Sequence, residues 1–269
     1  MRLVVTELVK KDVFIAIFQL LKNCSHAVNI SFKEEFMYIQ GMDKSHICLF
    51  EIHIKSGWFA EYNLSEGDSN SICVPITIFQ NILGICSETQ SIVIHYEGDD
   101  VEKINIDLLV GDVPAKNNKK VIESNKYFTI PLVEFDCELL SIIDIDYDAE
   151  FSINSKKVTD IVSQLLLFGD TMNVYCSEEK ITMGSSGTDG DMHVKIPIDD
   201  LNEFSINEGD TIKNCYSLQN INKLCLSSKL SQEIEFSISK EFPLRIKYDL
   251  TGDSYIQFFI APKIDNDNE

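Results

Sequence analysis

Hydrophobic and polar residues alternate along this chain with two different periods, and the switches between them mark its predicted elements. Apolar residues recur at helical spacing in four segments, and this spacing predicts a helix in each. The four segments are Val9–Asn23, Pro75–Cys86, Ser155–Phe168 and Lys213–Lys229. Short apolar or alternating runs predict strands, at Ala27–Phe32, Phe36–Gln40, Ile47–Ile54, Phe59–Leu64, Ser91–Tyr96, Lys103–Leu109, Tyr127–Phe135, Met172–Cys176, Lys180–Gly184, His193–Ile198, Glu233–Ser239, Leu244–Leu250 and Tyr255–Ile260. The pattern indicates an α+β fold.

This order of elements occurs twice. The residues around Gln19–Leu21 and Val28–Ile30 are echoed around Gln164–Leu166 and Met172–Val174, roughly 140–145 residues later. A repeat of this length is typical of a duplicated domain rather than of a solenoid unit. Each copy runs helix, strands, helix, strands, which predicts two helices on one face of a sheet.

A polar segment, Gly111–Asn125, interrupts the first copy. Its proline and its lysine-asparagine clusters predict a long exposed loop. The lysines of this segment also allow a nuclear localisation signal, but a solvated loop is the preferred interpretation.

The composition narrows the class of protein. Of 269 residues, 44% are hydrophobic, which is enough for a folded core. The eight cysteines form no Cys-x-x-Cys pair, and no signal peptide or long uncharged apolar run occurs, so we expect a reducing compartment and no membrane partner. The five histidines show no metal-ligand spacing, and no nucleophile or phosphate-loop motif is present. We therefore expect no metal, no cofactor and no catalytic residue.

The charge is unevenly distributed along the chain. Acidic residues outnumber basic ones by 43 to 23, for a net charge of −20, and such a surface repels nucleic-acid phosphates. Yet the four predicted helices carry eight lysines, two aspartates and no glutamate. Lysine is simply a good helix former, but glutamate forms helices equally well. The distribution therefore indicates a basic helical face.

One stretch, Tyr38–Phe50, reads as a strand, a tight polar turn and a second strand. Its core, Gln40–Ile47, resembles the Gln-x-Met-Asp-x-Ser-His-Val/Ile stretch of DNA sliding clamps of the proliferating cell nuclear antigen (PCNA) type. Pro243–Ile246 and Phe258–Ile264 resemble the Pro-Leu-x-Val and Tyr-Tyr-Leu-Ala-Pro-Lys-Ile ending of that family. The two motifs lie about 200 residues apart in the family's order, so the resemblance spans nearly the whole chain.

The resemblance implies two tandem similar clamp domains, with helices on the inner face of antiparallel sheets and three subunits forming a pseudo-six-fold ring. The implied parts are an N-terminal domain (1–135), a connector (136–147), a C-terminal domain (148–264) and an acidic tail (265–269). Tyr127–Phe135 of one subunit is then expected to pair edge to edge with Lys180–Ser186 of the next.

The same resemblance implies a processivity factor that is not an enzyme. It would encircle double-stranded DNA without reading sequence, tether DNA polymerase and other replication or repair proteins, and be placed on DNA by a clamp loader, in the nucleus or at a viral replication site. The implied DNA-facing residues are Lys10, Lys11, Lys22, Lys156, Lys157, Lys213 and Lys223. The second helix departs from the family, because Asn81 and Gly84 stand where lysines are common. Fewer phosphate contacts predict weaker DNA binding.

The family binds short partner peptides in an apolar pocket beneath the connector. The residues that match this pocket are Met42, His46, Ile47, Leu49, Ile143, Pro243, Phe259, Ile260, Ala261 and Pro262. An adaptable methionine among aliphatic side chains suits the anchors of a helical peptide. The connector also allows an ordinary edge strand packed on the core.

Two other functions stay open. A clamp-fold subunit of a heterotrimeric checkpoint-type clamp, or a regulatory scaffold that does not encircle DNA alone, would fit the depleted helix lysines and the long loop. An enzyme would require turnover that is lost when Asp43 or His46 is mutated.

Overall fold

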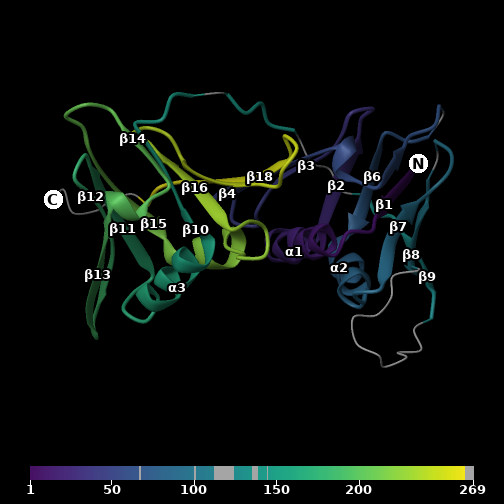
Figure 1. Ribbon diagram of the computed structural model, residues 1–269, viewed down its shortest axis with the longest axis horizontal. Helices are drawn as coiled ribbons and strands as arrows, with labels where there is room; N and C mark the ends of the chain where they lie inside the picture. The colour runs from purple at the N-terminus through teal and green to yellow at the C-terminus, as the bar shows by residue number, and fades with distance from the viewer. Residues whose placement is uncertain (67, 100, 112–123, 135–138, 144, 264–269) are drawn as a thin grey trace. The chain divides into compact units, whose positions relative to one another are not determined.

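The computed structural model divides the chain into two compact units (Figure 1). It describes all residues except 67, 100, 112–123, 135–138, 144 and 264–269. Unit 1 comprises Met1–Gly41, Ile52–Glu138 and Leu250–Ser254, and unit 2 comprises Met42–Glu51, Leu139–Asp249 and Tyr255–Glu269. Within the described residues, no helix has the length and apolar character needed to cross a membrane.

Unit 1 contains two helices and two groups of antiparallel strands. Its elements are β1 (Arg2–Val5), α1 (Leu8–Cys24), β2 (Ala27–Phe32), β3 (Phe36–Met42), the second half of β4 (Cys48–Lys55), η1 (Ser56–Trp58), β5 (Glu61–Asn63), β6 (Ser71–Pro75), α2 (Ile76–Gly84), β7 (Gln90–His95), β8 (Lys103–Val110) and β9 (Lys126–Pro131). One sheet has the order β5-β1-β7-β8-β9, and a second group pairs β6 with β2 and β2 with β3.

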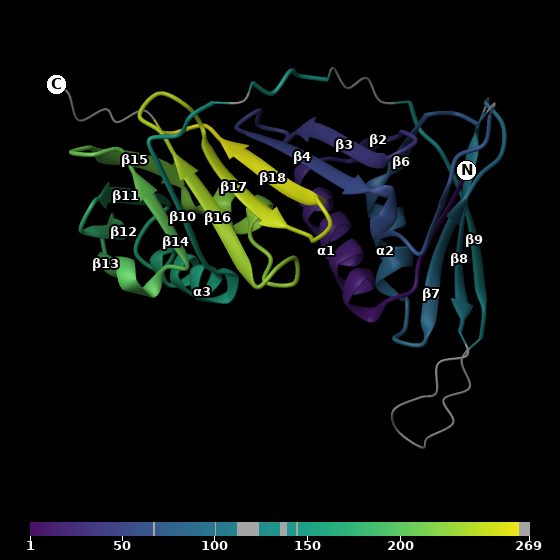
Figure 2. The same cartoon turned by 45° about the horizontal axis from the view of Figure 1, so that its top comes forward.

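The helices α1 and α2 lie side by side, and α2 packs against the β2 and β6 strands (Figures 1 and 2). Apolar residues recur every three or four positions along α1, so Phe14, Ile17 and Leu21 are all buried on one side. The rings of Phe18 on α1 and Phe79 on α2 pack with centroids 4.7 Å apart. This aromatic contact joins the two helices into one buried layer.

Unit 2 repeats this layout. Its elements are the first half of β4, β10 (Ala149–Asn154), α3 (Ser155–Leu165), β11 (Thr171–Ser177), β12 (Lys180–Gly187), β13 (Gly190–Pro197), η2 (Ile198–Asp200), β14 (Glu203–Ile206), β15 (Thr211–Ser217), α4 (Leu218–Asn220), η3 (Ile221–Cys225), β16 (Glu233–Ile238), β17 (Leu244–Asp249) and β18 (Tyr255–Ile260). Antiparallel strands run in the orders β14-β10-β16-β17-β18 and β13-β12-β11-β15.

The core of unit 2 lies between its strands and α3. Phe151 on β10 and Phe236 on β16 stack with centroids 5.2 Å apart. Val158, Val162 and Leu165 of α3 are fully or almost fully buried. Asn154 caps α3, because its side chain accepts a hydrogen bond from the Lys157 backbone N–H at 3.1 Å.

The predicted α+β class with antiparallel sheets is confirmed. The fourth predicted helix was wrong at both ends. Lys213–Ser217 belongs to β15, where Ile212 and Tyr216 alternate into the core, and the helical turns end at Cys225 rather than at Lys229. The strands β1, β6, β10, β14 and β15 were not predicted. Most of the predicted loop (112–123) lies outside the described residues.

Lys11 is not the exposed DNA-facing residue that the sequence predicted. It lies on the inner side of α1 with only 2% of its surface exposed. Its ammonium donates hydrogen bonds to the carbonyl oxygens of Ser87, at 3.1 Å, Glu88, at 2.7 Å, and Gln90. A buried charge must be paired or hydrogen-bonded, and here it ties the loop after α2 to α1.

Candidate functional site

An apolar patch lies on unit 2, where the turn after β3 meets the end of β18. The Ala261 backbone N–H donates to the Ile47 carbonyl at 3.1 Å, which joins the two segments. Leu49 and Phe259 are half-buried on neighbouring strands, and Ile47 is 37% exposed. The other patch residues that retain exposed surface are Met42, Pro243, Ala261 and Pro262. Such a surface can accept apolar side chains of a ligand.

Ile260 does not belong to this patch. Its side chain is fully buried, as are those of Ile256 and Phe258, while Phe259 is only half-buried. Alternate residues of a strand point to opposite faces. The sequence prediction placed both Phe259 and Ile260 in the pocket wall, but only Phe259 reaches the exposed face of β18.

The turn Met42–Ile47 is held by the carboxylate of Asp43. This side chain accepts hydrogen bonds from the backbone N–H groups of Ser45 (2.9 Å), Ile47 (2.8 Å) and Cys48 (2.7 Å), and from the Ser45 hydroxyl. Burial alone would raise the pKa of Asp43, but these hydrogen bonds outweigh burial and hold the pKa below its ordinary value of 3.8.

His46 sits exposed at the tip of this turn with a φ of 55°. A residue with a Cβ adopts this left-handed conformation only at a cost of roughly 1 kcal/mol. The Asp43 hydrogen bonds offset the strain and present both His46 and Ile47 to solvent. We therefore assign Asp43 a positioning role that the turn composition alone did not reveal.

Tyr147, in the last part of the predicted connector, packs on unit 2 beside Arg245. The Arg245 guanidinium lies 4.9 Å from the centre of the Tyr147 ring and forms ion pairs with Glu150 and Glu235, each at 2.8 Å. Arg245 is also the strand partner of Phe259. Ile143, further back in the connector, is 76% exposed, so its apolar side chain is available to a ligand.

The predicted DNA-facing lysines of unit 1 have close neighbours. Lys10 pairs with Glu7 at 3.0 Å and lies over the Trp58 ring. Lys22 donates to the side-chain oxygens of Gln80 and Asn81, both at 3.2 Å. With Lys11 buried, the helices of unit 1 offer less positive charge to a ligand than the sequence suggested.

Three of the predicted lysines of unit 2 are exposed on its helices. Lys156 and Lys157 lie in the first turn of α3, and Lys223 lies in η3. Lys157 also contacts Asp200 at 3.3 Å. Lys213 differs from these three, because it lies on β15 on the face opposite the buried Ile212 and Tyr216. Grouping Lys213 with the helical lysines was therefore wrong.

Each unit has an edge strand that could pair with another chain. Among the described residues, β9 ends one sheet of unit 1 and β13 ends one sheet of unit 2. The predicted edge, Lys180–Ser186, was wrong because β12 is paired on both sides, with β11 and with β13. The sequence did carry a signal for the pairing of β12 with β13, since Thr188-Asp189-Gly190 is typical of a hairpin turn between two paired strands.

Replacing Asp43 by Asn should destabilise the protein, because an amide has one acceptor oxygen where the carboxylate uses two. We expect a loss of about 2 kcal/mol in the free energy of unfolding at pH 7. Since the folded pKa lies below 3.8, the wild-type advantage should be lost as the pH falls through the folded pKa. Urea unfolding at pH 7 and pH 3 measures both effects.

The matched control is Asp160→Asn, which changes an exposed carboxylate on α3 and should leave the free energy of unfolding within about 0.5 kcal/mol of wild type. An Asp43→Asn variant as stable as this control at pH 7 would contradict the positioning role.

Comparisons with known proteins cover almost the entire chain. Residues 3–139 match the family model "Proliferating cell nuclear antigen, N-terminal domain", and residues 141–263 match "Proliferating cell nuclear antigen, C-terminal domain". The chain is 25% identical over 267 residues to Proliferating cell nuclear antigen 1 of Plasmodium falciparum, covering 93% of both proteins. It is 24% identical over 262 residues to Proliferating cell nuclear antigen of Chaetomium thermophilum, covering 96% of this chain and 95% of the relative.

The fold agrees with a solved structure. The crystal structure of PCNA from Thermococcus kodakaraensis matches with a TM-score of 0.83 and 16% sequence identity, over 97% of this chain and 99% of that one. Both domain models, the full-length relatives and the fold lead to one assignment. The chain belongs to the proliferating cell nuclear antigen family, a family of non-enzymatic clamps.

Proposed function

We propose that this chain assembles as a homotrimeric ring, encircles double-stranded DNA, and tethers DNA polymerase and other replication or repair proteins to it. The observation that carries the proposal is the pair of edge strands, β9 in unit 1 and β13 in unit 2, within a chain that has both family domains. Two different edges form a head-to-tail contact, and such contacts generate rings when the rotation closes. The proposed site of action is the nucleus or a site of viral DNA replication.

The DNA contact of this proposal is electrostatic and falls mainly on unit 2. Lys156, Lys157 and Lys223 are exposed on its helices, whereas Lys11 is buried and Lys10 and Lys22 have polar neighbours within unit 1. Lysine suits sliding, because its flexible point charge imposes no fixed geometry on a phosphate. A clamp loader is the proposed partner that opens and closes the ring.

Partner proteins are proposed to bind the apolar patch through short helical peptides. Ile47, Leu49 and Phe259 supply apolar contacts, and Met42 adapts to different anchors. The Asp43 turn fixes the position of Ile47, which lowers the ordering cost of binding.

A second candidate is a subunit of a heterotrimeric clamp, or a scaffold that does not encircle DNA alone. The weakly basic helices of unit 1 favour it, because α2 carries no lysine and Lys11 is unavailable to DNA. The mass measurement below separates the two candidates.

Light scattering across a dilution series should give three times the chain mass of 30.6 kDa. Tyr127→Glu should yield monomers, because it places a charge on the β9 edge, where the side chain is 67% exposed. Leu139→Glu, at an exposed connector position, is the matched control and should leave the trimer intact. A wild-type monomer at all concentrations would exclude the homotrimer and favour the heterotrimeric subunit.

Lys156→Gln should weaken the binding of a linear duplex DNA several-fold at low salt and make the salt dependence shallower, because each copy loses a phosphate contact. Lys10→Gln should change little, since Glu7 already pairs with Lys10. Lys180→Gln, on β12, is a control that should match wild type. Fluorescence anisotropy over a range of salt concentrations measures the slope, and equal slopes for Lys156→Gln and wild type would contradict the assignment.

Ile47→Ser should abolish the binding of a polymerase-derived clamp-binding peptide without changing the mass of the assembly, because it removes the exposed apolar side chain of the turn. Ile78→Ser, at a 45% exposed position on α2, is the matched control and should bind the peptide normally. Calorimetric titration measures both affinities. Unchanged affinity for Ile47→Ser would show that the peptide binds elsewhere.

A further inference from the structure

The four-stranded sheet of unit 2 carries a row of polar side chains across the face away from its core. In strand register this row is Lys213, Tyr175, Thr182 and Lys195, with one residue from each strand. The alternate residues, such as Val174, are buried on the opposite face. The row is therefore turned toward solvent, where a ligand can reach it.

Positive charge gathers around this row although the chain has a net charge of −20. The ammonium groups of Lys180 and Lys213 lie 5.7 Å and 5.9 Å from the centre of the Tyr175 ring. The ring attracts both cations, so it holds near one another two charges that repel. Lys195 is exposed at the far end of the row. An anionic ligand at this place would relieve the repulsion between the lysines.

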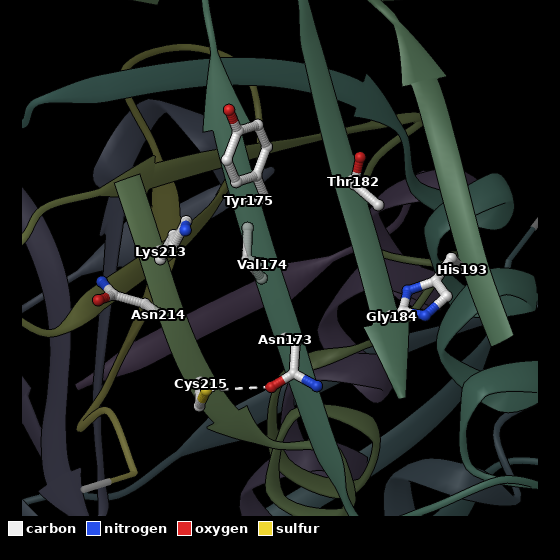
Figure 3. A pocket seen from close by; sticks show the side chains of 9 residues that line it. All are labelled: Asn173, Val174, Tyr175, Thr182, Gly184, His193, Lys213, Asn214 and Cys215. Atoms are coloured by element: carbon white, nitrogen blue, oxygen red, sulfur yellow. Dashed lines mark hydrogen bonds between the residues drawn. The ribbon is translucent and has the colours of Figure 1, made fainter. Parts of the chain in front are cut away.

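The same face is hollowed (Figure 3). A cavity of about 280 Å³ is lined by Lys213 and Thr182 of this row and by Asn173, Gly184 and His193 of the next. A Cβ at Gly184 would collide with Nδ1 of His193, so the hollow depends on the absence of a side chain there. Because one water molecule takes about 30 Å³, the cavity has room for a larger group than a bare phosphate.

A neutral donor accompanies the lysines in the hollow. The Cys215 thiol donates to the Asn173 side-chain oxygen at 3.0 Å, and the Asn173 amide nitrogen lies on the side of β12 (Figure 3). Asn173 and Lys213 are diagonal neighbours on paired strands, a separation of about 7–8 Å. One phosphoryl group, with a hydrogen bond of about 2.8 Å to each side chain, can span that gap.

The surroundings of the hollow favour a compact anion over an extended one. Asp191 lies 3.3 Å from the His193 imidazole, and Glu178 and Glu179 are exposed in the turn between β11 and β12. A nucleic acid would bring further phosphates against these carboxylates, which repel them. A phosphoryl group instead concentrates a charge of about −1.5 to −2 in one place. The lysines can therefore meet the whole charge of such a ligand.

We propose that this hollow binds a phosphotyrosine side chain of a partner peptide. Lys213 and Lys180 neutralise the phosphoryl group, and the Asn173 amide donates a hydrogen bond to it. The aromatic ring of the ligand fills the remaining volume and packs beside Tyr175. This site goes beyond the proposed clamp function and requires neither DNA nor the apolar patch.

The test is the alkylation rate of Cys215 in the full chain with iodoacetamide, resolved by peptide mass mapping, because Cys215 lines the same hollow. The probe is the peptide Ala-Gly-phosphotyrosine-Gly-Ala at about 1 mM, with the unphosphorylated peptide as its control. The phosphopeptide should slow alkylation about twofold or more, the factor for a dissociation constant at or below that concentration. The control peptide should not slow it. Equal rates with both peptides would overturn the proposal.

A matched pair of variants locates the binding site. Lys213→Gln should abolish the protection of Cys215, because it removes the positive charge that lines the hollow. Lys103→Gln, at an exposed position on β8 of unit 1, changes the net charge equally and should keep the protection. Each rate is divided by that of the same variant without peptide, so a changed thiol pKa cancels. Protection that survives in Lys213→Gln would overturn the assignment. Both lysines are exposed, so these variants should fold normally.

The ligand class is tested with three competing probes at the same concentration. Inorganic phosphate that protects Cys215 as well as the phosphopeptide would overturn the peptide as ligand and indicate a site for free anions. Equal protection by a peptide with glutamate in place of phosphotyrosine would show that any acidic peptide suffices. Protection by a short single-stranded DNA, but not by the phosphopeptide, would overturn the proposal in favour of a nucleic-acid site.

Discussion

The structure depends on the one-sided burial of antiparallel sheets. Each unit hides one face of its strands against its helices, so every second residue of a strand is committed to the core. The residues between them point away from the core. The apolar patch, the Arg245–Tyr147 contact and the exposed lysines of the β13-β12-β11-β15 sheet all use those alternate positions of unit 2. Stability and recognition therefore reside on opposite faces of the same strands.

This division explains which predictions were possible from the sequence. Periodicity alone located α1, α2, α3 and most strands, and two motifs identified the family, because both signals are written locally in the chain. Register and partner choice are not local. The pairing of β12 with β13 showed which strand is the edge, although the turn at Thr188–Gly190 already hinted at that hairpin, and the burial of Ile260 showed which face of β18 is exposed.

Lysine was the least predictable residue type, because one side chain serves three physical roles here. Lys11 is buried and bonds three carbonyl oxygens, Lys156 is exposed on a helix, and Lys213 lies beside an aromatic ring on a sheet. Charge counting treats the three alike. The three lysines differ in the groups that contact their ammonium ions. Those groups come from segments far away in the sequence, which a flexible side chain can reach.

The contact between Gly184 and His193 has an evolutionary consequence. Because the imidazole fills the space that a side chain at residue 184 would need, alanine at 184 requires the exposed His193 ring to move away. A smaller residue at 193 would relieve the contact instead. Across related chains, these positions on neighbouring strands should therefore tend to vary as a pair.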